Sequence, residues 1–537
     1  MLKYKIKEII QQAIKAVFPK ADIIEFAVEA ADPKFGDYSA NAAMVLGKAM
    51  GENPMDIANN IIDSIKSDEI FAAVEFAKPG FINFKIALPY LQKQILEINK
   101  AGEKYGNSDL GKDLKINVEF VSANPTGPLT LGNGRGAYAG DSLANVLESF
   151  GASVEREYYI NDRGAQIIAL GHSILKDAQA VYRGKYIDEL KDLIVHYHTA
   201  QYGSGKPEEV GQLAAAIIME ESIKKTILKM GIKFDRWFSE SALYKGAIED
   251  AMGILDSHRL TYKKDGALWL KTTDYGDDKD RVLITSEKEF TYFAADLAYH
   301  WVKIKRGYNT LIDIWGADHH GYIGRMKAGI EILEKELEEG VDFEILIAQL
   351  VRLISKGKEI KMSKRAGTYV TLDELIDEVG PDVTRFFFLE RALNTHMDFD
   401  LDLAKEKSEK NPVYYIQYAY ARIHSILAKF EARNPKSETN SKSQITKLIK
   451  EKQEIDLIKE LVKLPDIIIE TAEDHQVQRL PYYAIELATR FHNFYEQCRV
   501  ISEDENLTAA RISLIKATQI VLKKTLDLMG ISAPEKM

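Results

Sequence analysis

A glycine-rich segment between a strand pattern and a helix pattern constrains this chain more than any other feature. Ile116, Val118 and Phe120 alternate as they would in a strand, and residues 121–136, VSANPTGPLTLGNGRG, follow directly. An apolar helical pattern comes next and ends at a glycine, after which residues 154–160 form a second strand pattern. This order predicts a βαβ unit, and therefore a parallel sheet with a right-handed crossover.

Length and composition place few restrictions on function. At 537 residues the chain exceeds what one hydrophobic core normally serves, so we expect three or more domains. The lone cysteine, Cys498, excludes an internal disulfide framework and a multi-cysteine zinc site. The net charge of −10 speaks against nucleic-acid binding only weakly, because salt screens distant charges and local patches set the near field.

The patterns divide the chain into an α/β protein of three domains, with a small α+β domain, a Rossmann-like parallel-sheet domain and an all-α helical bundle. The expected boundaries are 1–105, 106–390 and 391–537, with an insertion at about 168–285 in the second domain. After the insertion we expect the sheet to resume near Tyr292 and at residues 311–316. Residues 434–443, NPKSETNSKS, are expected to form a polar loop.

The glycine-rich segment suits a nucleotide. A strand, a glycine-rich turn and a helix direct backbone N–H groups at an anion, and the helix dipole helps. Gly132 would let an adenine approach the backbone, and Arg135 and Gly136 open the helix. A turn chosen only for tight packing would leave the same pattern, since lone glycine motifs are unspecific.

A second segment, KEIKMSKRAG at residues 358–367, suits the other end of a nucleotide. Lys361 and Lys364 could stabilise the charge that builds on a leaving pyrophosphate. Gly357 and Gly367 would let the loop move. The alternative is a solvated basic loop. The two segments, in this order, indicate nucleotide chemistry more specifically than either alone.

The segments resemble the two ATP motifs of class I aminoacyl-tRNA synthetases, and further stretches resemble arginyl-tRNA synthetase over nearly the whole chain. These stretches are EYYINDRGAQ (157–166), KFDRWFSES (233–241), DGALWL (265–270), TYFAADLAYH (291–300), IWGADHHGY (314–322) and NPVYYIQYAYARI (411–423). The resemblance implies an ATP-dependent arginine–tRNA ligase with an N-terminal tRNA-contacting domain, a catalytic domain and a C-terminal anticodon-binding domain. It also implies that tRNA must bind before arginine is activated.

The resemblance also implies roles for single residues. The catalytic residues would be Lys361, Lys364, Thr130 and Asn133. ATP would contact Gly127, Pro128, Leu131, Gly132, Asn133, Arg135, Met362 and Ser363. Arginine would be held by Asn124, Tyr292, Asp296 and His320. The tRNA would contact Phe35, Asp37 and Tyr38 in the first domain and Tyr414, Gln417 and Tyr418 in the third.

The chemistry of these residues fits the substrate. A buried carboxylate such as Asp296 can pair a guanidinium through two hydrogen bonds. If Tyr292 and Asp296 lie one helical turn apart, both face the same way. Without the resemblance, Asp296 would be read as an ordinary exposed carboxylate and the tyrosines of residues 414–420 as core aromatics. His319 and His320 would not share a metal, because adjacent side chains of a strand point apart.

The first motif departs from the family pattern His-Ile-Gly-His, because Thr130-Leu131-Gly132-Asn133 stands in its place. Threonine and asparagine keep hydrogen-bond donors but cannot carry positive charge. We expect an active enzyme in which Lys361, Lys364 and Arg135 carry more of the phosphate charge. The alternatives are a catalytically weakened or non-catalytic tRNA-binding paralogue, and a different adenylate-forming or nucleotidyl-transferring enzyme on the same fold.

The expected partners are tRNA(Arg), L-arginine and ATP, with Mg²⁺ arriving on ATP and no structural metal. No apolar run is long enough to span a membrane and the N-terminus lacks the features of a signal peptide, so we expect a cytoplasmic protein. A monomer is expected.

Overall fold

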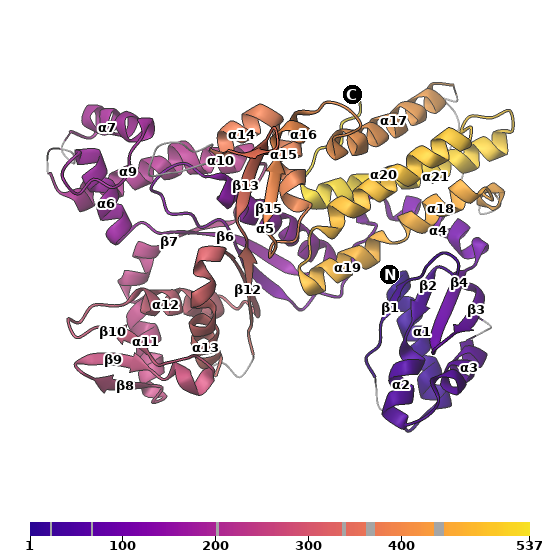
Figure 1. The fold of residues 1–537 in the computed structure, drawn as a ribbon, viewed down its shortest axis with the longest axis horizontal. Coiled ribbons are helices and arrows are strands. Elements are labelled where there is room, and N and C mark those ends of the chain that lie inside the picture. Colours follow the sequence, from indigo (N-terminus) through magenta and orange to yellow (C-terminus); the bar gives the residue numbers. More distant parts are fainter. Residues whose placement is uncertain are drawn as a thin grey trace.

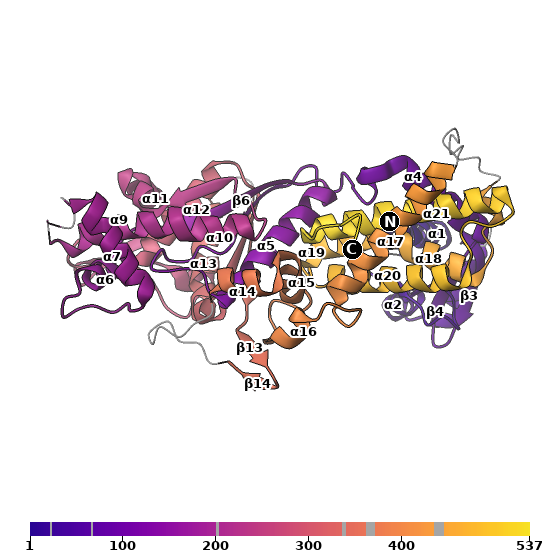
Figure 2. The same cartoon turned by 90° about the horizontal axis from the view of Figure 1, so that it is seen from above.

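The structure, a computed structural model, describes residues 1–21, 24–65, 68–199, 203, 205–335, 340–360, 371–433 and 445–537. The chain forms an elongated molecule in which a small domain at one end leans on a helical bundle, and the bundle leads into the parallel sheet (Figures 1 and 2). The expected α/β fold is confirmed. Residues 361–370 lie outside the described residues, and so does the loop expected at 434–443.

The N-terminal domain pairs a four-stranded antiparallel sheet, in the order β1-β2-β4-β3, with helices. Its first helix buries the apolar face that its spacing predicts, with Ile6 and Ile10 fully enclosed. The elements are α1 (Leu2–Val17), β1 (Val28–Ala30), β2 (Tyr38–Ala40), α2 (Ala42–Met50), α3 (Pro54–Ile65), β3 (Phe71–Ala77), β4 (Phe81–Ile86) and α4 (Leu88–Ala101).

The central sheet is five-stranded and parallel, in the order β12-β11-β5-β6-β7. The predicted βαβ unit consists of β5, α5 and β6, and its two strands pair in parallel. Along the sheet the chain runs from β5 to β6 and β7 on one side and returns to β11 and β12 on the other. The elements are β5 (Lys115–Glu119), α5 (Leu131–Phe150), β6 (Ser153–Ile160), β7 (Arg236–Ser239), α12 (Tyr292–Lys305), β11 (Thr310–Gly316), α13 (Ile323–Glu334) and β12 (Asp342–Ala348).

Two expectations about this domain need correction. The range expected as an insertion, 168–285, contains β7, which pairs with β6 in the central sheet. The sheet also does not resume at Tyr292, which begins helix α12 with Thr291 as its N-cap. The short, mixed sequence RWFS of β7 lacks the apolar run of a buried strand, because β7 is an edge strand.

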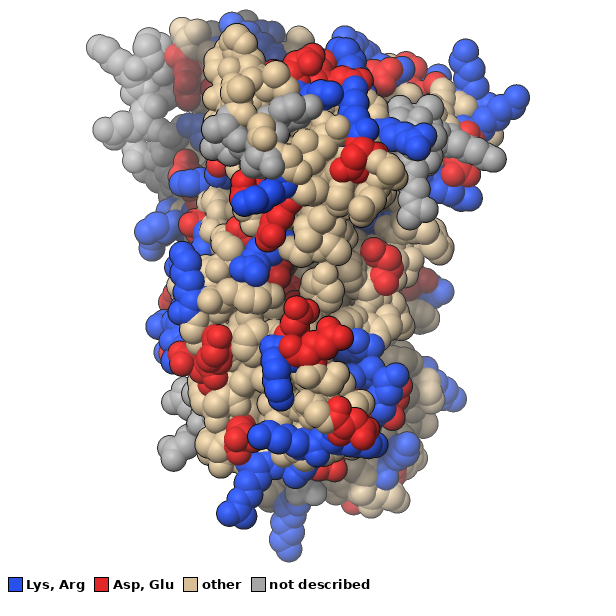
Figure 3. Space-filling model, turned by 90° about the vertical axis from the view of Figure 1, so that its left-hand side faces the viewer, with Lys and Arg blue, Asp and Glu red and all other residues tan. Residues whose placement is uncertain are grey.

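The segments around β7 form two small units at one end of the molecule. The first, between β6 and β7, is helical, and the second carries a three-stranded antiparallel sheet. Figure 3 views this end, where cationic and anionic side chains are interspersed. The elements are α6 (Ala165–Leu175), α7 (Lys185–Tyr197), α9 (Pro207–Ile218), α10 (Lys224–Lys229), α11 (Ala247–Ser257), β8 (Thr261–Lys264), β9 (Ala267–Leu270) and β10 (Arg281–Ile284).

After the central sheet the chain forms a small mixed sheet, β14-β13-β15, and then the helical bundle. The helices α17, α20 and α21 each bury an apolar stripe in the bundle, and Gly530 ends α21 in a left-handed conformation. The elements are β13 (Val351–Ser355), β14 (Lys358–Glu359), α14 (Leu372–Val379), α15 (Pro381–Leu389), β15 (Met397–Asp400), α16 (Leu401–Lys405), α17 (Pro412–Arg433), α18 (Lys452–Leu461), α19 (Leu464–Asp474), α20 (Arg479–Gln497) and α21 (Glu505–Met529).

No helix in the described part of the chain is long and apolar enough to cross a membrane. The same residues contain no group of three or more histidine, cysteine or acidic side chains arranged to hold a metal ion.

Candidate active site

The glycine-rich segment turns from the carboxyl end of β5 into the N-terminus of α5, as the sequence predicts. Gly132 is exposed, and a side chain built there would meet only the Thr130 hydroxyl, at 3.8 Å. Gly127 is buried against Tyr186 of α7, whose hydroxyl donates to the Thr126 carbonyl at 3.0 Å. The open backbone at Gly132 is the part of the segment that a nucleotide could approach.

Thr130 and Asn133 bond to each other. Thr130 is the N-cap of α5, and both its backbone N–H and its hydroxyl donate to Asn133 Oδ1, at 2.9 and 3.0 Å. The pair therefore satisfies the start of the helix in the manner of a capping box. Among the described residues, no acceptor is assigned to the Asn133 amide nitrogen, so this nitrogen is the donor left for a ligand.

The described segment that follows the second sequence motif contacts this helix start. Thr130 forms an isolated antiparallel bridge with Thr371, and Leu372 N–H donates to the Leu129 carbonyl at 2.9 Å. Thr371 follows residues 361–370 directly. Lys361, Met362, Ser363 and Lys364 themselves lie outside the described residues, so their expected contacts stay predictions.

Arg135 does not fit the phosphate role that the sequence suggested. Its side chain is fully buried, and its guanidinium donates to the carbonyls of Gln349 and Ala392 at 3.3 and 2.5 Å. Burial lowers the pKa of Arg135 to about 10. Helical spacing turns this position toward the sheet that α5 covers, which is why a residue so close to the motif points into the protein. Leu131 is likewise buried, so only its backbone remains for ATP.

A cavity of about 400 Å³ opens at the carboxyl ends of β5, β6, β7 and β11, and we call it the sheet-edge cavity. Ligands of open parallel sheets bind at this edge, where the strand order reverses. Of the residues predicted to hold arginine, Asn124, Tyr292 and Asp296 line the cavity. Tyr292 and Asp296 lie one turn apart on α12 and share a face, as expected.

His320 is the exception among the predicted arginine contacts. It is exposed and absent from the cavity lining, whereas its neighbour His319 lines the cavity. Both histidines belong to a 3-10 helix, Ala317–Tyr322, rather than to a strand. The one-residue difference follows from this local geometry, which the sequence reading did not anticipate.

Glu240 and Tyr322 are cavity residues that the sequence reading did not single out. Glu240 follows β7 directly and is only 4% exposed; burial and repulsion from Asp296 raise its pKa to about 7. The Tyr322 hydroxyl donates to Asp296 Oδ2 at 2.6 Å. Asn161, with its amide nitrogen as donor, reaches Glu240 Oε2 at 2.7 Å. Glu240 could have been found by asking which acidic residues follow strands. It was not, because residues 168–285 were expected to be an insertion and β7 was therefore not predicted.

A buried ionic cluster forms the floor beneath α12. Lys303 is fully buried and donates to Glu119 Oε2 at 2.6 Å and to Asp313 Oδ1 at 3.0 Å. His300 bridges the Asp296 carbonyl and Asp313 Oδ2 at 2.8 and 2.9 Å. Burial would raise the pKa of Asp313, but Lys303 and His300 lower it to about 2. Because Lys303 offsets the floor acids, Asp296 and Glu240 remain as the acids available to a cationic ligand.

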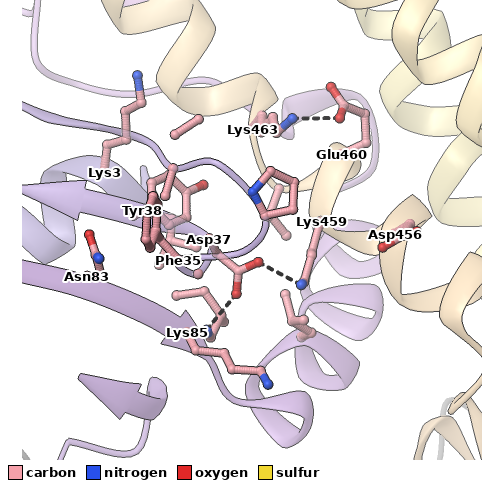
Figure 4. Close-up of a pocket in the computed structure, with 18 of the residues that line it drawn as sticks. Lys3, Phe35, Asp37, Tyr38, Asn83, Lys85, Asp456, Lys459, Glu460 and Lys463 are labelled. Atoms are coloured by element: carbon pink, nitrogen blue, oxygen red, sulfur yellow. Dashed lines mark hydrogen bonds and ion pairs between the residues drawn. The ribbon is translucent and has the colours of Figure 1, made fainter. Parts of the chain in front are cut away.

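The N-terminal domain and the bundle enclose a second cavity of about 610 Å³, the interdomain cavity (Figure 4). Phe35 is half exposed there, but Tyr38 is 5% exposed. Asp37 accepts from Ile86 N–H at 2.8 Å and pairs with Lys459 of α18 at 2.6 Å. Of the three tRNA contacts predicted in this domain, only Phe35 has a free side-chain surface.

The three residues of the bundle that were predicted to contact tRNA differ in their exposure. Tyr418 is 43% exposed and stacks on His492, with the Arg422 guanidinium over its ring. Tyr414 is partly buried. Gln417 is 8% exposed, and its amide donates to Asp382 and Ser532 at 2.8 and 3.2 Å. Gln417 therefore ties the bundle to α15, and its predicted tRNA contact would require these bonds to break.

Comparisons with known proteins agree with this geometry. Family models match for the arginyl tRNA synthetase N-terminal domain (residues 4–86), the catalytic domain of class I tRNA synthetases (R) (94–225) and the DALR anticodon binding domain (416–537). A protein of Aquifex aeolicus named arginine–tRNA ligase is 40% identical, with all of both chains covered. The chain belongs to the arginyl-tRNA synthetase family.

Other members give the same result. The arginine–tRNA ligase of Listeria welshimeri is 43% identical, covering 99% of this chain and 98% of its own. A solved structure from Campylobacter jejuni, described as a putative arginyl-tRNA synthetase, is 33% identical with a TM-score of 0.73, covering 84% of this chain and all of its own. The Thermus thermophilus arginyl-tRNA synthetase shares the fold over the full length of both chains, with a TM-score of 0.81 at 21% identity.

Proposed function

We infer that this protein is an arginine–tRNA ligase, which activates L-arginine with ATP and transfers it to the 3′ end of tRNA(Arg). The observation that carries the inference is the sheet-edge cavity, where Asp296 and Glu240 lie close enough to raise the pKa of Glu240, beside the glycine-rich start of α5. Two neighbouring carboxylates fit one guanidinium, which offers two hydrogen-bonding edges and a permanent charge.

In the first step the carboxylate of arginine attacks the α-phosphorus of ATP, and the bond to the bridging oxygen of pyrophosphate breaks. This gives arginyl-adenylate and pyrophosphate. Asn124, Tyr292 and Asp296 would orient arginine, and Gly127, Pro128, Leu131 and Gly132 would seat ATP through their backbone. We propose that Lys361 and Lys364 stabilise the departing pyrophosphate, with Met362 and Ser363 holding ATP in the same loop. Mg²⁺ enters as part of the ATP substrate.

In the second step a terminal ribose hydroxyl of tRNA attacks the carbonyl of the adenylate, and AMP leaves. We propose that residues 391–537 hold the anticodon arm and that residues 1–105 contact the corner of the tRNA, with 106–390 carrying the chemistry. The exposed ring of Tyr418, which stacks on His492, supports a base-stacking role. Tyr414 is proposed as its neighbour in this contact, and Phe35 as the contact from the first domain. We propose a cytoplasmic monomer.

Nothing in the comparisons supports a catalytically weakened paralogue. Charging assays with tRNA(Arg) transcript and labelled arginine test the proposal. We expect charging with arginine and none with lysine. Asp296→Asn should raise the KM for arginine by about tenfold or more, because a hydrogen-bonded charge is lost. Failure of the wild-type protein to charge tRNA(Arg) would contradict the proposal.

A further inference from the structure

We propose that Tyr322 is a positioning residue for this reaction, whose hydroxyl fixes one oxygen of Asp296 and leaves the other open to the guanidinium of the substrate. The inference rests on the proposed function, since it needs a guanidinium in the sheet-edge cavity. It concerns a residue to which the resemblance gave no role, and it assigns that residue a role exercised through Asp296.

The geometry fixes the tyrosine from several sides. Tyr322 ends the 3-10 helix that follows β11, while Asp296 lies on α12, so the 2.6 Å bond from Oη to Oδ2 joins two separate elements. The ring packs near Trp315 and Phe293, with centroids 6.1 and 6.4 Å away, and the Arg325 guanidinium lies over it at 4.6 Å. These neighbours restrain the ring, and its hydroxyl is directed at Asp296.

The bond also acts on the charge of Asp296. Burial raises the pKa of this carboxyl, and the Tyr322 hydroxyl lowers it by bonding the ionised form. Burial and Asp296 raise the pKa of Tyr322 well above its usual value, so the hydroxyl remains a donor at all physiological pH. The other charged or titratable groups around Asp296 come from several elements: His300 on its own helix, Asp313 on β11, His319 on the 3-10 helix after β11, Glu240 and Tyr244 on the 3-10 helix after β7, and Tyr159 on β6.

One carboxylate oxygen is left for a ligand. Tyr322 is the only side-chain donor that reaches Asp296 among the described residues, and its bond occupies Oδ2. Asp296 is partly exposed in the cavity that it lines. A guanidinium N–H can therefore bond Oδ1 while Tyr322 keeps the carboxylate from rotating, and the second edge of the guanidinium is left for Glu240.

The test is Tyr322→Phe, which keeps the ring and removes only the hydroxyl. Its matched control is Tyr262→Phe, because Tyr262 also donates to a carboxylate, Asp280, at 3.0 Å, but on the small sheet away from the cavity. Steady-state charging is measured against arginine and against ATP from pH 6 to pH 9, together with the melting temperature of each variant.

We expect Tyr322→Phe to raise the KM for arginine on the order of tenfold while leaving kcat and the KM for ATP unchanged. The rise should be largest at low pH and shrink as pH increases, because Asp296 without its donor protonates more readily. The control should behave as wild type.

Three results for Tyr322→Phe would overturn the inference. The first is an unchanged KM for arginine with an unchanged pH profile, which would give the hydroxyl no role. The second is an equal change in the KM values for arginine and ATP, and the third is a protein that fails to fold; either would give the hydroxyl a different role. Absence of charging by the wild type would instead refute the proposed function.

Discussion

Thr130 and Asn133 stand where class I synthetases usually carry two histidines, and the structure gives the pair a definite arrangement. Both the backbone and the hydroxyl of Thr130 donate to Asn133 Oδ1, so the two residues cap α5 together. The sequence could identify both as retained polar donors, but it could not show that the Thr130 hydroxyl donates to Asn133. Among the described residues, the amide nitrogen of Asn133 is the side-chain donor of the pair that remains for a ligand.

Restoring both histidines tests whether this pair is an adaptation. The double variant Thr130→His/Asn133→His should keep or raise the rate of charging at saturating ATP, since two chargeable groups replace neutral ones. It should lower the stability by about 1 kcal/mol, because the cap is lost. Charging rates and thermal melts measure both effects. Complete loss of activity in a folded variant would show that the site is rebuilt around the polar pair.

Glu240 predicts a pH dependence of arginine binding. Its pKa of about 7 in the free protein means that a large fraction is protonated at pH 6 and ionised at pH 8. A guanidinium needs the ionised form, so the KM for arginine should fall as pH rises through 7.

Glu240→Gln should raise the KM at pH 8 and flatten this part of the profile, and the KM for ATP serves as the internal control. A wild-type KM that is constant between pH 6 and 8 would contradict the role of Glu240.

The sequence predicts the site best where the family resemblance assigns a role to a single residue. Asn124, Tyr292 and Asp296 were identified from the resemblance to arginyl-tRNA synthetase, and all three line one cavity. Glu240 and Tyr322 lie inside two of the stretches that carry the resemblance. They were missed because their part in the cavity depends on how separate segments meet in space. Arg135 lies within the motif, yet tertiary packing turns it toward the carbonyls of Gln349 and Ala392.

At the scale of elements, apolar periodicity predicted the helices of the bundle and the first βαβ unit, because each buries one continuous face. It failed at β7, because this four-residue edge strand has too few apolar residues to give a recognisable pattern. It also placed a strand where α12 begins. The short 3-10 helix after β11 buries no residue, so apolar periodicity could not predict it. The difference between His319 and His320 was missed with it.

The end of α21 depends on one glycine. Gly530 has a φ of +69°, and a Cβ there would lie 2.1 Å from Nη1 of Arg385. Arg385 is only 1% exposed. Its guanidinium donates to Asp141 of α5 at 2.5 Å and to the carbonyls of Met529 and Met230 at 2.9 Å each. Arg385 therefore joins α15, α5 and the end of α21 at one point.

Gly530→Ala should destabilise the protein by about 2 kcal/mol or more, because it combines an unfavourable φ with a clash against a buried guanidinium. The matched control is Gly253→Ala in α11, where nothing lies within 4 Å and the change should be neutral or stabilising by about 0.5–1 kcal/mol. Chemical denaturation of both variants measures the difference. Equal stabilities would show that Arg385 moves aside without cost.

Across the whole molecule, the N-terminal domain is anchored to the bundle by contacts between residues more than 400 positions apart. Asp466 of α19 is 2% exposed and accepts from the backbone N–H groups of Leu2 and Lys3 at 2.9 and 3.1 Å. A buried carboxylate from one domain thus meets the N-terminus of a helix in another. Sequence patterns cannot reveal such a pairing, because neither segment carries a local sign of it.

Removing this anchor should loosen the first domain. Asp466→Ala leaves two N–H groups of α1 unpaired, which should cost about 1–3 kcal/mol and speed amide exchange in α1. Asp456→Ala, which removes another acid that lines the interdomain cavity, is the control. Hydrogen exchange followed by mass spectrometry gives the readout. Unchanged exchange in α1 would contradict the anchoring role.

The central claim is that the sheet-edge cavity and the glycine-rich start of α5 together activate arginine. Arginine-dependent exchange of pyrophosphate into ATP, with and without tRNA(Arg), measures that step directly. We predict exchange that requires arginine and appears when tRNA(Arg) is present. Absence of exchange under both conditions, in a protein that still binds tRNA, would contradict the account and favour a non-catalytic tRNA-binding role.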